Sequence, residues 1–243
     1  MCIRDSPITV SAAVTVTGTY KIQYQLTFAQ SGIGGDTGAN TVVTVAGSPK
    51  AAGVLPFSDW FDAGSSVTYS YQATVDTSPA SGKRYALTTP APTPASPITV
   101  SAAVTVTGTY KIQYQLTFAQ SGIGGDTGAN TVVTVAGSPK AAGVLPFSDW
   151  FDAGSSVTYS YENTVNTSPA SGKRYALTTP APSPASPITV SAAATITGTY
   201  KIQYRLTFAQ SGIGNDTGAN TIVTVAGSPK AAGVLPFSDW FDA

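Results

Sequence analysis

Val14-Thr-Val-Thr-Gly-Thr-Tyr-Lys-Ile-Gln-Tyr-Gln-Leu-Thr-Phe-Ala29 decides the fold class of this chain. Its even positions carry Val, Gly, Tyr, Ile, Leu and Phe, and its odd positions carry Thr, Lys, Gln and Ala. This alternation predicts β-strand, because successive side chains of a strand point to opposite faces. The stretch would extend about 50 Å, more than one small sandwich needs. We therefore expect it to close one domain and open the next, with Gly18 as the bend.

The same stretch belongs to a tandem repeat. Ser6-Pro-Ile-Thr-Val10 recurs at Ser96 and at Ser186, ninety residues apart each time. Copies one and two differ at four positions, and copies two and three differ at five over the part they share. A ninety-residue period is the size of a domain and longer than a solenoid repeat, so each copy should have its own core.

Domain limits follow from combining the repeat with the strand pattern. We predict sandwich repeats at 20–109 and 110–199, an incomplete repeat at 200–243, and the last strands of a preceding repeat at 7–19. Residues 1–6 contain the only Met and the only Cys. Their reverse translation resembles a sequencing-library adapter, so we interpret them as a leader foreign to the protein. The proline-rich segment 90–97 is a competing boundary, which we interpret as a loop within the domain.

The remainder of each copy also predicts strands. Val67, Tyr69, Tyr71, Ala73 and Val75 alternate with polar residues, and stretches rich in Gly and Pro separate the strands. The predicted fold class is therefore all-β, with tandem immunoglobulin-like antiparallel β-sandwich domains. Large aromatic residues beside turns are the expected core anchors, and in the three copies these are Trp60, Trp150, Trp240, Tyr24, Tyr114 and Tyr204.

Composition excludes several kinds of chemistry. The 243 residues include 12 basic and 12 acidic side chains and no His, so neither nucleic-acid attraction nor a His base is expected. Zinc sites lack their usual ligands for the same reason. The sequence predicts no cofactor and no catalytic residue, and it contains no apolar segment long enough for a transmembrane helix.

Three aspartates remain as weak candidates for a metal site of oxygen ligands. Asp59 and Asp62 lie three residues apart, and Asp36 lies in a glycine-rich loop. No Asp-x-Asp-x-Asp run accompanies them, and turn capping by single aspartates is more common than metal binding. The basic pair Lys83 and Arg84 is a candidate grip for an anionic glycan, with solvated surface as the alternative.

Two N-glycosylation sequons occur where the copies differ. They begin at Asn166 and at Asn215, each in a predicted turn. Both would accept an N-glycan if the chain enters a compartment outside the cytoplasm. Chance occurrence in a Thr-rich chain is the alternative.

Four segments carry a family resemblance: Tyr20-Lys-Ile-Gln-Tyr-Gln-Leu-Thr-Phe28, Trp60-Phe-Asp-Ala-Gly-Ser-Ser-Val-Thr-Tyr69, Gly82-Lys-Arg-Tyr-Ala-Leu87 and Val104-Thr-Val-Thr-Gly-Thr-Tyr110. In this order they resemble the tandem β-sandwich repeats of archaeal and some bacterial secreted or surface-anchored proteins. Ile22 stands where Thr is usual there, and Phe61 where Tyr is frequent. The resemblance implies an extracellular or cell-surface location and transfers no catalytic residue.

The sequence thus predicts a non-enzymatic structural or spacer region of an extracellular protein. A multivalent module that binds carbohydrate or protein is one alternative, and accessory repeats of a secreted hydrolase are another. Expected partners are the neighbouring repeats, a glycan or protein ligand, and further copies of the chain associating through the incomplete repeat. A filament built by strand exchange is a weaker alternative. No nucleic-acid partner and no membrane insertion are expected.

Overall fold

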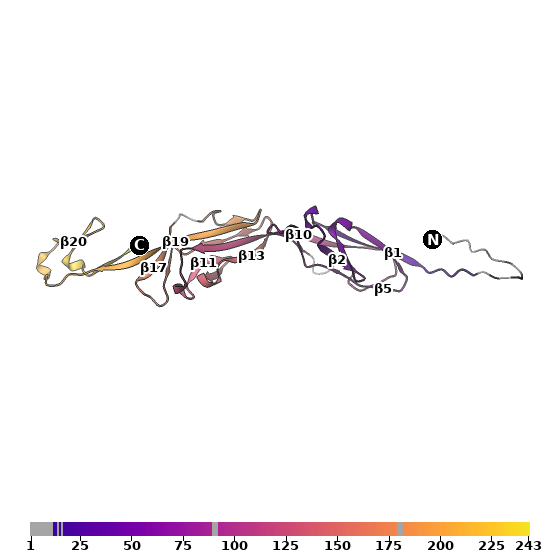
Figure 1. Cartoon of the computed structure of the whole chain (residues 1–243), viewed down its shortest axis with the longest axis horizontal. Coiled ribbons are helices and arrows are strands. Elements are labelled where there is room, and N and C mark those ends of the chain that lie inside the picture. Colours follow the sequence, from indigo (N-terminus) through magenta and orange to yellow (C-terminus); the bar gives the residue numbers. More distant parts are fainter. Residues whose placement is uncertain (1–11, 14, 16, 89–91, 179–181) are drawn as a thin grey trace. The chain divides into compact units, whose positions relative to one another are not determined.

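The structure is a computed structural model, and it describes residues 12, 13, 15, 17–88, 92–178 and 182–243. Contacts divide the chain into two compact units (Figure 1). Unit 1 is Met1–Ala73 with Leu87–Tyr110, and unit 2 is Thr74–Ala86 with Lys111–Ala243. The predicted leader 1–6 and most of segment 7–19 lie outside the described residues. The predicted limits 20–109, 110–199 and 200–243 stay predictions as limits of independently folding domains.

Unit 1 consists of strands and two turns of 3-10 helix. Its elements are β1 (Gln23–Ser31), η1 (Gly35–Thr37), β2 (Thr41–Val45), β3 (Ser48–Ala51), η2 (Ala52–Val54), β4 (Phe57–Asp62), β5 (Ser66–Val67), β6 (Tyr69–Tyr71), β9 (Ile98–Thr99) and the first part of β10 (Val104–Ser121).

Unit 2 repeats this order and adds the short hairpin that precedes it. The hairpin is β7 (Thr74–Asp76) and β8 (Lys83–Leu87). After the rest of β10 come η3 (Gly125–Thr127), β11 (Thr131–Val135), β12 (Ser138–Ala141), η4 (Ala142–Val144), β13 (Phe147–Asp152), β14 (Ser156–Val157), β15 (Tyr159–Tyr161), β16 (Thr164–Asn166), β17 (Lys173–Leu177), β18 (Ile188–Thr189) and β19 (Ala194–Phe208).

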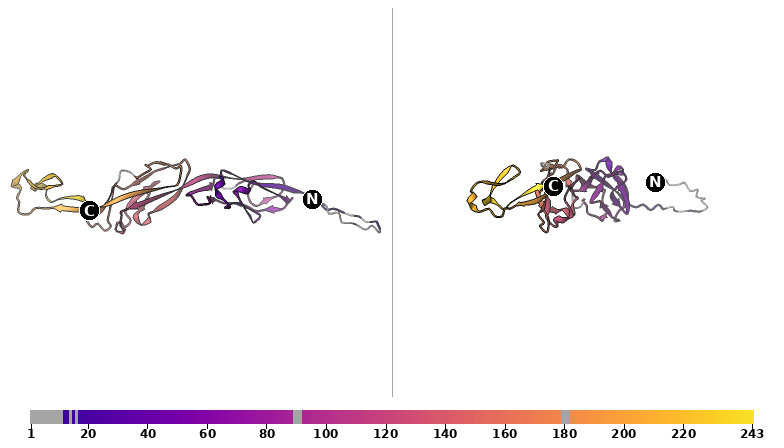
Figure 2. Two further views of the ribbon diagram at one scale, coloured as in Figure 1. Left: turned by 45° about the horizontal axis from the view of Figure 1, so that its top comes forward. Right: turned by 60° about the vertical axis from the view of Figure 1, so that its left-hand side comes forward.

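The third copy follows β19 and is yellow in Figure 2. It consists of η5 (Asn215–Thr217), β20 (Thr221–Val225), β21 (Ser228–Ala231), η6 (Ala232–Val234) and β22 (Phe237–Asp242). Its sequence includes no counterpart of 154–199, and Leu206 is 47% exposed where the equivalent Leu116 is fully buried. Among the described residues, no helix is long and apolar enough to cross a membrane.

The core of unit 2 lies between two layers of strands. β10 and β19 belong to one sheet, while β12, β11 and β15 form the other. Leu116, Phe118, Val133, Tyr175 and Ile196 are each at most 1% exposed and form part of one cluster with the aromatic rings of β15. The predicted all-β fold class, with tandem sandwich-like units built from several sheets, is confirmed.

One strand pair in each unit is parallel rather than antiparallel. β1 pairs with β10 from Leu26↔Val104 onward, and β10 pairs with β19 from Leu116↔Ala194 onward. In unit 2 the hydroxyl of Tyr161 fastens this pair, because it lies 2.7 Å from the carbonyl oxygen of Ala119 and 2.9 Å from that of Ile196. Burial raises the pKa of Tyr161 to about 12, so the hydroxyl stays a donor at neutral pH.

The predicted bend at the strand glycine is wrong in both copies where a strand includes it. Gly108 lies inside β10 and Gly198 inside β19, and both strands continue through the glycine. A Cβ on Gly108 would lie 2.5 Å from a ring carbon of Tyr71. The glycine therefore makes room for an aromatic ring of the facing layer rather than for a turn.

The prediction that the tryptophans anchor the core is also wrong. Trp60 is 58% exposed, and its strand register explains why. Trp60 is opposite Gln25 in the antiparallel β1–β4 pair, whereas the fully buried Leu26 is opposite Asp59. Directly opposed residues share a face, so Trp60 lies on the face away from the core.

The other predicted anchors, two tryptophans and three tyrosines, differ in how deeply they are buried. Trp150 and Trp240 are half-buried and lie outside the core cluster. Tyr24 is half-buried, Tyr114 packs against the edge of the core of unit 2, and Tyr204 is 47% exposed. In the core cluster of unit 2 the buried aromatic anchors are instead Phe118, Tyr159, Tyr161, Tyr175 and Tyr200.

Candidate functional site

The junction between copies two and three lies entirely within unit 2 and is the most developed polar site there. Strand β19 belongs to both copies. Residues Ala194–Thr199 pair with β10 of copy two, residues Tyr200–Tyr204 pair with β17, and residues Gln203–Phe208 pair with β22 of copy three. The two copies are therefore joined through one continuous strand and its hydrogen bonds.

A stacked arginine fastens this junction. The guanidinium carbon of Arg174, on β17 of copy two, lies 4.4 Å from the ring centre of Trp240, on β22 of copy three. Its Nε donates a hydrogen bond of 2.8 Å to Oε1 of Gln203. A guanidinium over an indole face combines a cation–π interaction with burial of the flat apolar ring.

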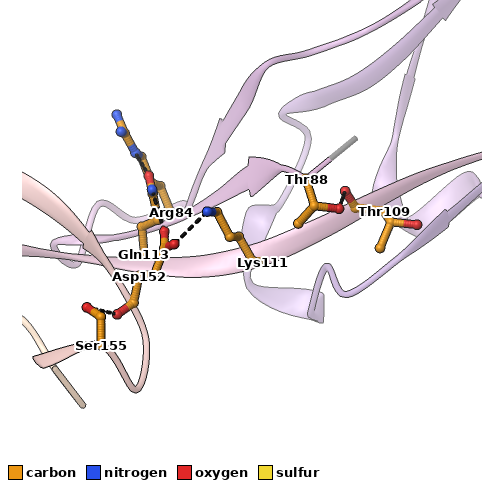
Figure 3. A network of polar contacts seen from close by, with 7 residues as sticks. All are labelled: Arg84, Thr88, Thr109, Lys111, Gln113, Asp152 and Ser155. Atoms are coloured by element: carbon orange, nitrogen blue, oxygen red, sulfur yellow. Dashed lines mark hydrogen bonds and ion pairs between the residues drawn. The ribbon is translucent and has the colours of Figure 1, made fainter. Parts of the chain in front are cut away.

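The same arrangement recurs one repeat earlier in unit 2. Arg84 lies 4.4 Å from the ring centre of Trp150 and donates a 2.8 Å hydrogen bond to Gln113. Figure 3 shows Arg84 beside Gln113, with Lys111 pointing toward Asp152. The prediction of either a free glycan grip or a solvated pair at Lys83 and Arg84 is therefore wrong for Arg84, whose guanidinium is bound within the protein.

The glutamine of each arrangement also donates a hydrogen bond to an aspartate carboxylate. Gln113 Nε2 donates a 2.8 Å hydrogen bond to Asp152, and Lys111 Nζ lies 2.5 Å from the other oxygen of that carboxylate. The hydrogen bonds from Lys111 and then Gln113 lower the pKa of Asp152 below its ordinary value. Lys201, Gln203 and Asp242 form the same group in copy three. These groups are largely exposed, so their ion pairs should contribute little to stability.

A second polar cluster fixes the glycine-rich loop of copy two. Asp126 accepts a 2.6 Å hydrogen bond from the hydroxyl of Tyr175, and its other oxygen lies 3.0 Å from Nζ of Lys173. These contacts, Tyr175 first, lower the pKa of Asp126. A Cβ on Gly124 would lie 2.7 Å from the Tyr175 hydroxyl, so glycine is needed for the contact.

The three aspartates proposed as weak metal ligands interact with other groups of the protein. Asp62 accepts hydrogen bonds of 2.9 Å from Lys21 and from Gln23, and Asp59 accepts one of 2.8 Å from the backbone N–H of Trp60. Asp36 also has a partner. Among the described residues, no group of three His, Cys, Asp or Glu side chains is placed to hold a metal ion.

The two sequon asparagines lie in different local structures. Asn166 is exposed at the end of β16, and its carbonyl oxygen accepts a 2.8 Å hydrogen bond from Asn130. Asn215 is the first residue of η5. Glycosylation at either asparagine stays a prediction.

Comparison with known sequences and structures reveals little similarity. No family model and no curated protein sequence matches this chain. Among solved structures, a match is Streptococcal High Identity Repeats in Tandem (SHIRT) domains 3-4 from a cell surface protein. The sequence identity is 18%, the match covers 73% of this chain and 96% of that one, and the TM-score is 0.21.

Proposed function

We propose that this chain is a non-enzymatic spacer region of an extracellular or cell-surface protein, in which each repeat is fixed to the next. The single observation that carries the proposal is the shared strand β19. Its hydrogen bonds begin in copy two and end in copy three without an intervening linker. A flexible tether has no such ladder, so the arrangement suits a part that transmits position along the chain.

The stacked arginine adds to this support. It connects a hairpin of copy two with a strand of copy three, so bending at the junction would separate Arg174 from Trp240. The near-identity of the copies also suits a spacer, because repetition of one unit changes length and leaves the type of junction unchanged. The residue resemblance described above supports the extracellular or cell-surface location.

The test measures whether the junction is stiff. In the full chain with Cys2→Ser, spin labels are attached at Ser160→Cys on β15 and Ser228→Cys on β21, both exposed positions. Double electron–electron resonance then gives the distance distribution between copies two and three. We expect a narrow distribution that broadens when Gly-Gly-Ser-Gly is inserted between Thr199 and Tyr200.

The matched control places the same insertion between Ala136 and Gly137, in the turn between β11 and β12. This control lengthens a turn and leaves β19 intact, so the distribution should stay narrow. A distribution in the uninterrupted chain as broad as that of the Thr199–Tyr200 insertion would refute the spacer proposal.

A further inference from the structure

The front edge of copy one is more exposed than the same edge of the later copies. Tyr20 is 81% exposed and Ile22 is 68% exposed, whereas the equivalent Tyr200 is 4% exposed and Ile202 packs against the core cluster. Trp60 is 58% exposed, whereas Trp240 is half-buried beneath Arg174. Because the residues are identical, the difference comes from the neighbours of each edge and not from the edge itself.

In unit 2 the neighbour that covers this edge is a hairpin from the preceding copy. β17 pairs with β19 so that Tyr175 is opposite Ile202, Arg174 opposite Gln203 and Leu177 opposite Tyr200. The hairpin also lines a cavity of about 240 Å³ beside Trp240, between its turn at Ala170–Gly172 and Arg205. The edge of copy two has the same cover, because β8 pairs with β10 and Gly82 accepts a 2.9 Å hydrogen bond from the N–H of Gln115.

We propose that the edge of copy one is an acceptor site for the hairpin of another repeat joined in front of Tyr20. We define the acceptor edge as the backbone of residues 20–24 with the side chains of Ile22, Gln23 and Trp60. Gln23 already lies beside Asp62, as Gln203 lies beside Asp242, so the hydrogen-bond acceptor for an incoming arginine is in position.

Tyr20 indicates how much of the preceding repeat takes part. The hydroxyl of Tyr200 donates to the carbonyl oxygen of Glu162 at 2.8 Å and lies 3.3 Å from that of Val132, both in the preceding copy. A hairpin alone lacks the strand that contains Val132. The occupant is therefore a complete repeat, whose hairpin covers Ile22 and Trp60 and whose core receives Tyr20.

Exchange between two identical chains does not supply this occupant. Hairpin β7–β8 already pairs within unit 2, and so does hairpin β16–β17. A hairpin that moved to copy one of another molecule would fill one acceptor edge and uncover an equivalent one. The exchange gains no contact, whereas a repeat joined in front of Tyr20 has a hairpin without another acceptor. This inference holds whether or not the array is a spacer, because it concerns one surface.

The test extends the full chain by one repeat and observes Trp60. Residues 1–5 are replaced by a second copy of residues 20–95, which keeps the repeat in register because Ser6 is equivalent to Ser96. Both chains are labelled with 5-fluorotryptophan, and the 19F signal of Trp60 is assigned with Trp60→Phe. We expect the H2O-to-D2O shift of Trp60 to fall in the extended chain to the value measured for Trp150. The amide of Gln25 should exchange as slowly as that of Gln115, its counterpart in copy two, which donates to the hairpin residue Gly82.

The matched control is the extended chain in which only the added copy of Arg84 is changed to Ala. Trp60 should regain part of its solvent shift there, while the amide of Gln25 keeps its protection, because the backbone pairing of the hairpin is unchanged. The inference fails if Trp60 in the extended chain keeps the solvent shift of the original chain. It also fails if the original chain dimerises at high concentration with loss of that shift, since a second molecule would then be the occupant.

Discussion

A Cβ atom on Gly198 would lie 2.5 Å from Cδ1 of Tyr161, far inside normal contact distance. The ring of Tyr161 thus packs directly on the backbone of β19, at the point where this strand leaves copy two and enters copy three. The contact therefore brings a large aromatic ring of copy two onto the strand glycine that precedes the repeat junction.

Gly198→Ala should destabilise unit 2 by about 1–3 kcal/mol, because either the Tyr161 ring or β19 must shift to admit the methyl group. Chemical denaturation followed by tyrosine and tryptophan fluorescence measures the change. Gly143→Ala is the control, since a Cβ there would meet no atom within 4 Å. Equal midpoints for the two variants would contradict the steric role of Gly198.

Tyr161→Phe should cost about 1 kcal/mol of unfolding free energy, because the change removes the hydroxyl that bonds to Ala119 and Ile196 and leaves the ring in place. Tyr204→Phe, at a position 47% exposed, is the control and should be nearly neutral. If Tyr161→Phe and Tyr204→Phe change the denaturation midpoint equally, the hydrogen bonds of the Tyr161 hydroxyl to the parallel strand pair do not stabilise the unit.

Arg174→Ala should lower the stability of unit 2 by about 1–2 kcal/mol, the sum expected for one cation–π stack and one hydrogen bond. It should also shift the fluorescence of Trp240, the ring that Arg174 covers. Arg205→Gln removes a positive charge from the neighbouring strand β19 and restores the residue that copy two has at Gln115, so it should change the stability little. Because Arg205 lies directly opposite Trp240, this variant controls the stability measurement and not the fluorescence. A Trp240 emission spectrum unaltered by Arg174→Ala would argue against the stack in solution.

Asp126 should make unit 2 sensitive to acid. Its pKa is lowered in the folded protein, chiefly by the Tyr175 hydroxyl and then by Lys173, so its stabilisation is present above the ordinary Asp pKa of about 3.9 and is lost as the pH falls through the folded value. Asp126→Asn should therefore be less stable than the original chain at pH 7, and the difference should shrink in acid. Thermal unfolding at several pH values measures it.

The control for this pH dependence is Asp216→Asn, at the equivalent position of copy three, where the sequence includes no counterpart of Tyr175. Its effect on stability at pH 7 should be small. A difference between Asp126→Asn and the original chain that stays constant down to acid pH would contradict the role assigned to the carboxylate.

Strand character could be predicted from local pattern because alternation is a property of consecutive residues. Val104–Ser121 alternates through both the predicted boundary and Gly108, and it forms one strand. The polar parity of Lys21 was correctly predicted as well, because Lys21 pairs with Asp62 on the exposed side. Neither result required knowledge of the neighbouring strands.

The contacts of the site residues could not be predicted from the local sequence pattern. Arg84 and Arg174 are single basic residues at strand starts, and nothing near them in sequence indicates that each covers a tryptophan sixty-six residues later. Trp60 was predicted as a core anchor on its size and its place before a turn, yet the register of β4 against β1 directs it away from the core.

The sequence by itself determined the repeat, the all-strand character and the two faces of every long strand, because these follow from identity and alternation along the chain. Only the tertiary structure decided which face is covered, which strands pair in parallel, and that a hairpin of the preceding copy completes the edges of copies two and three. The physical reason is that burial depends on residues far away in sequence: Tyr20 and Tyr200 lie in the same local sequence, and one is exposed while the other is in a core.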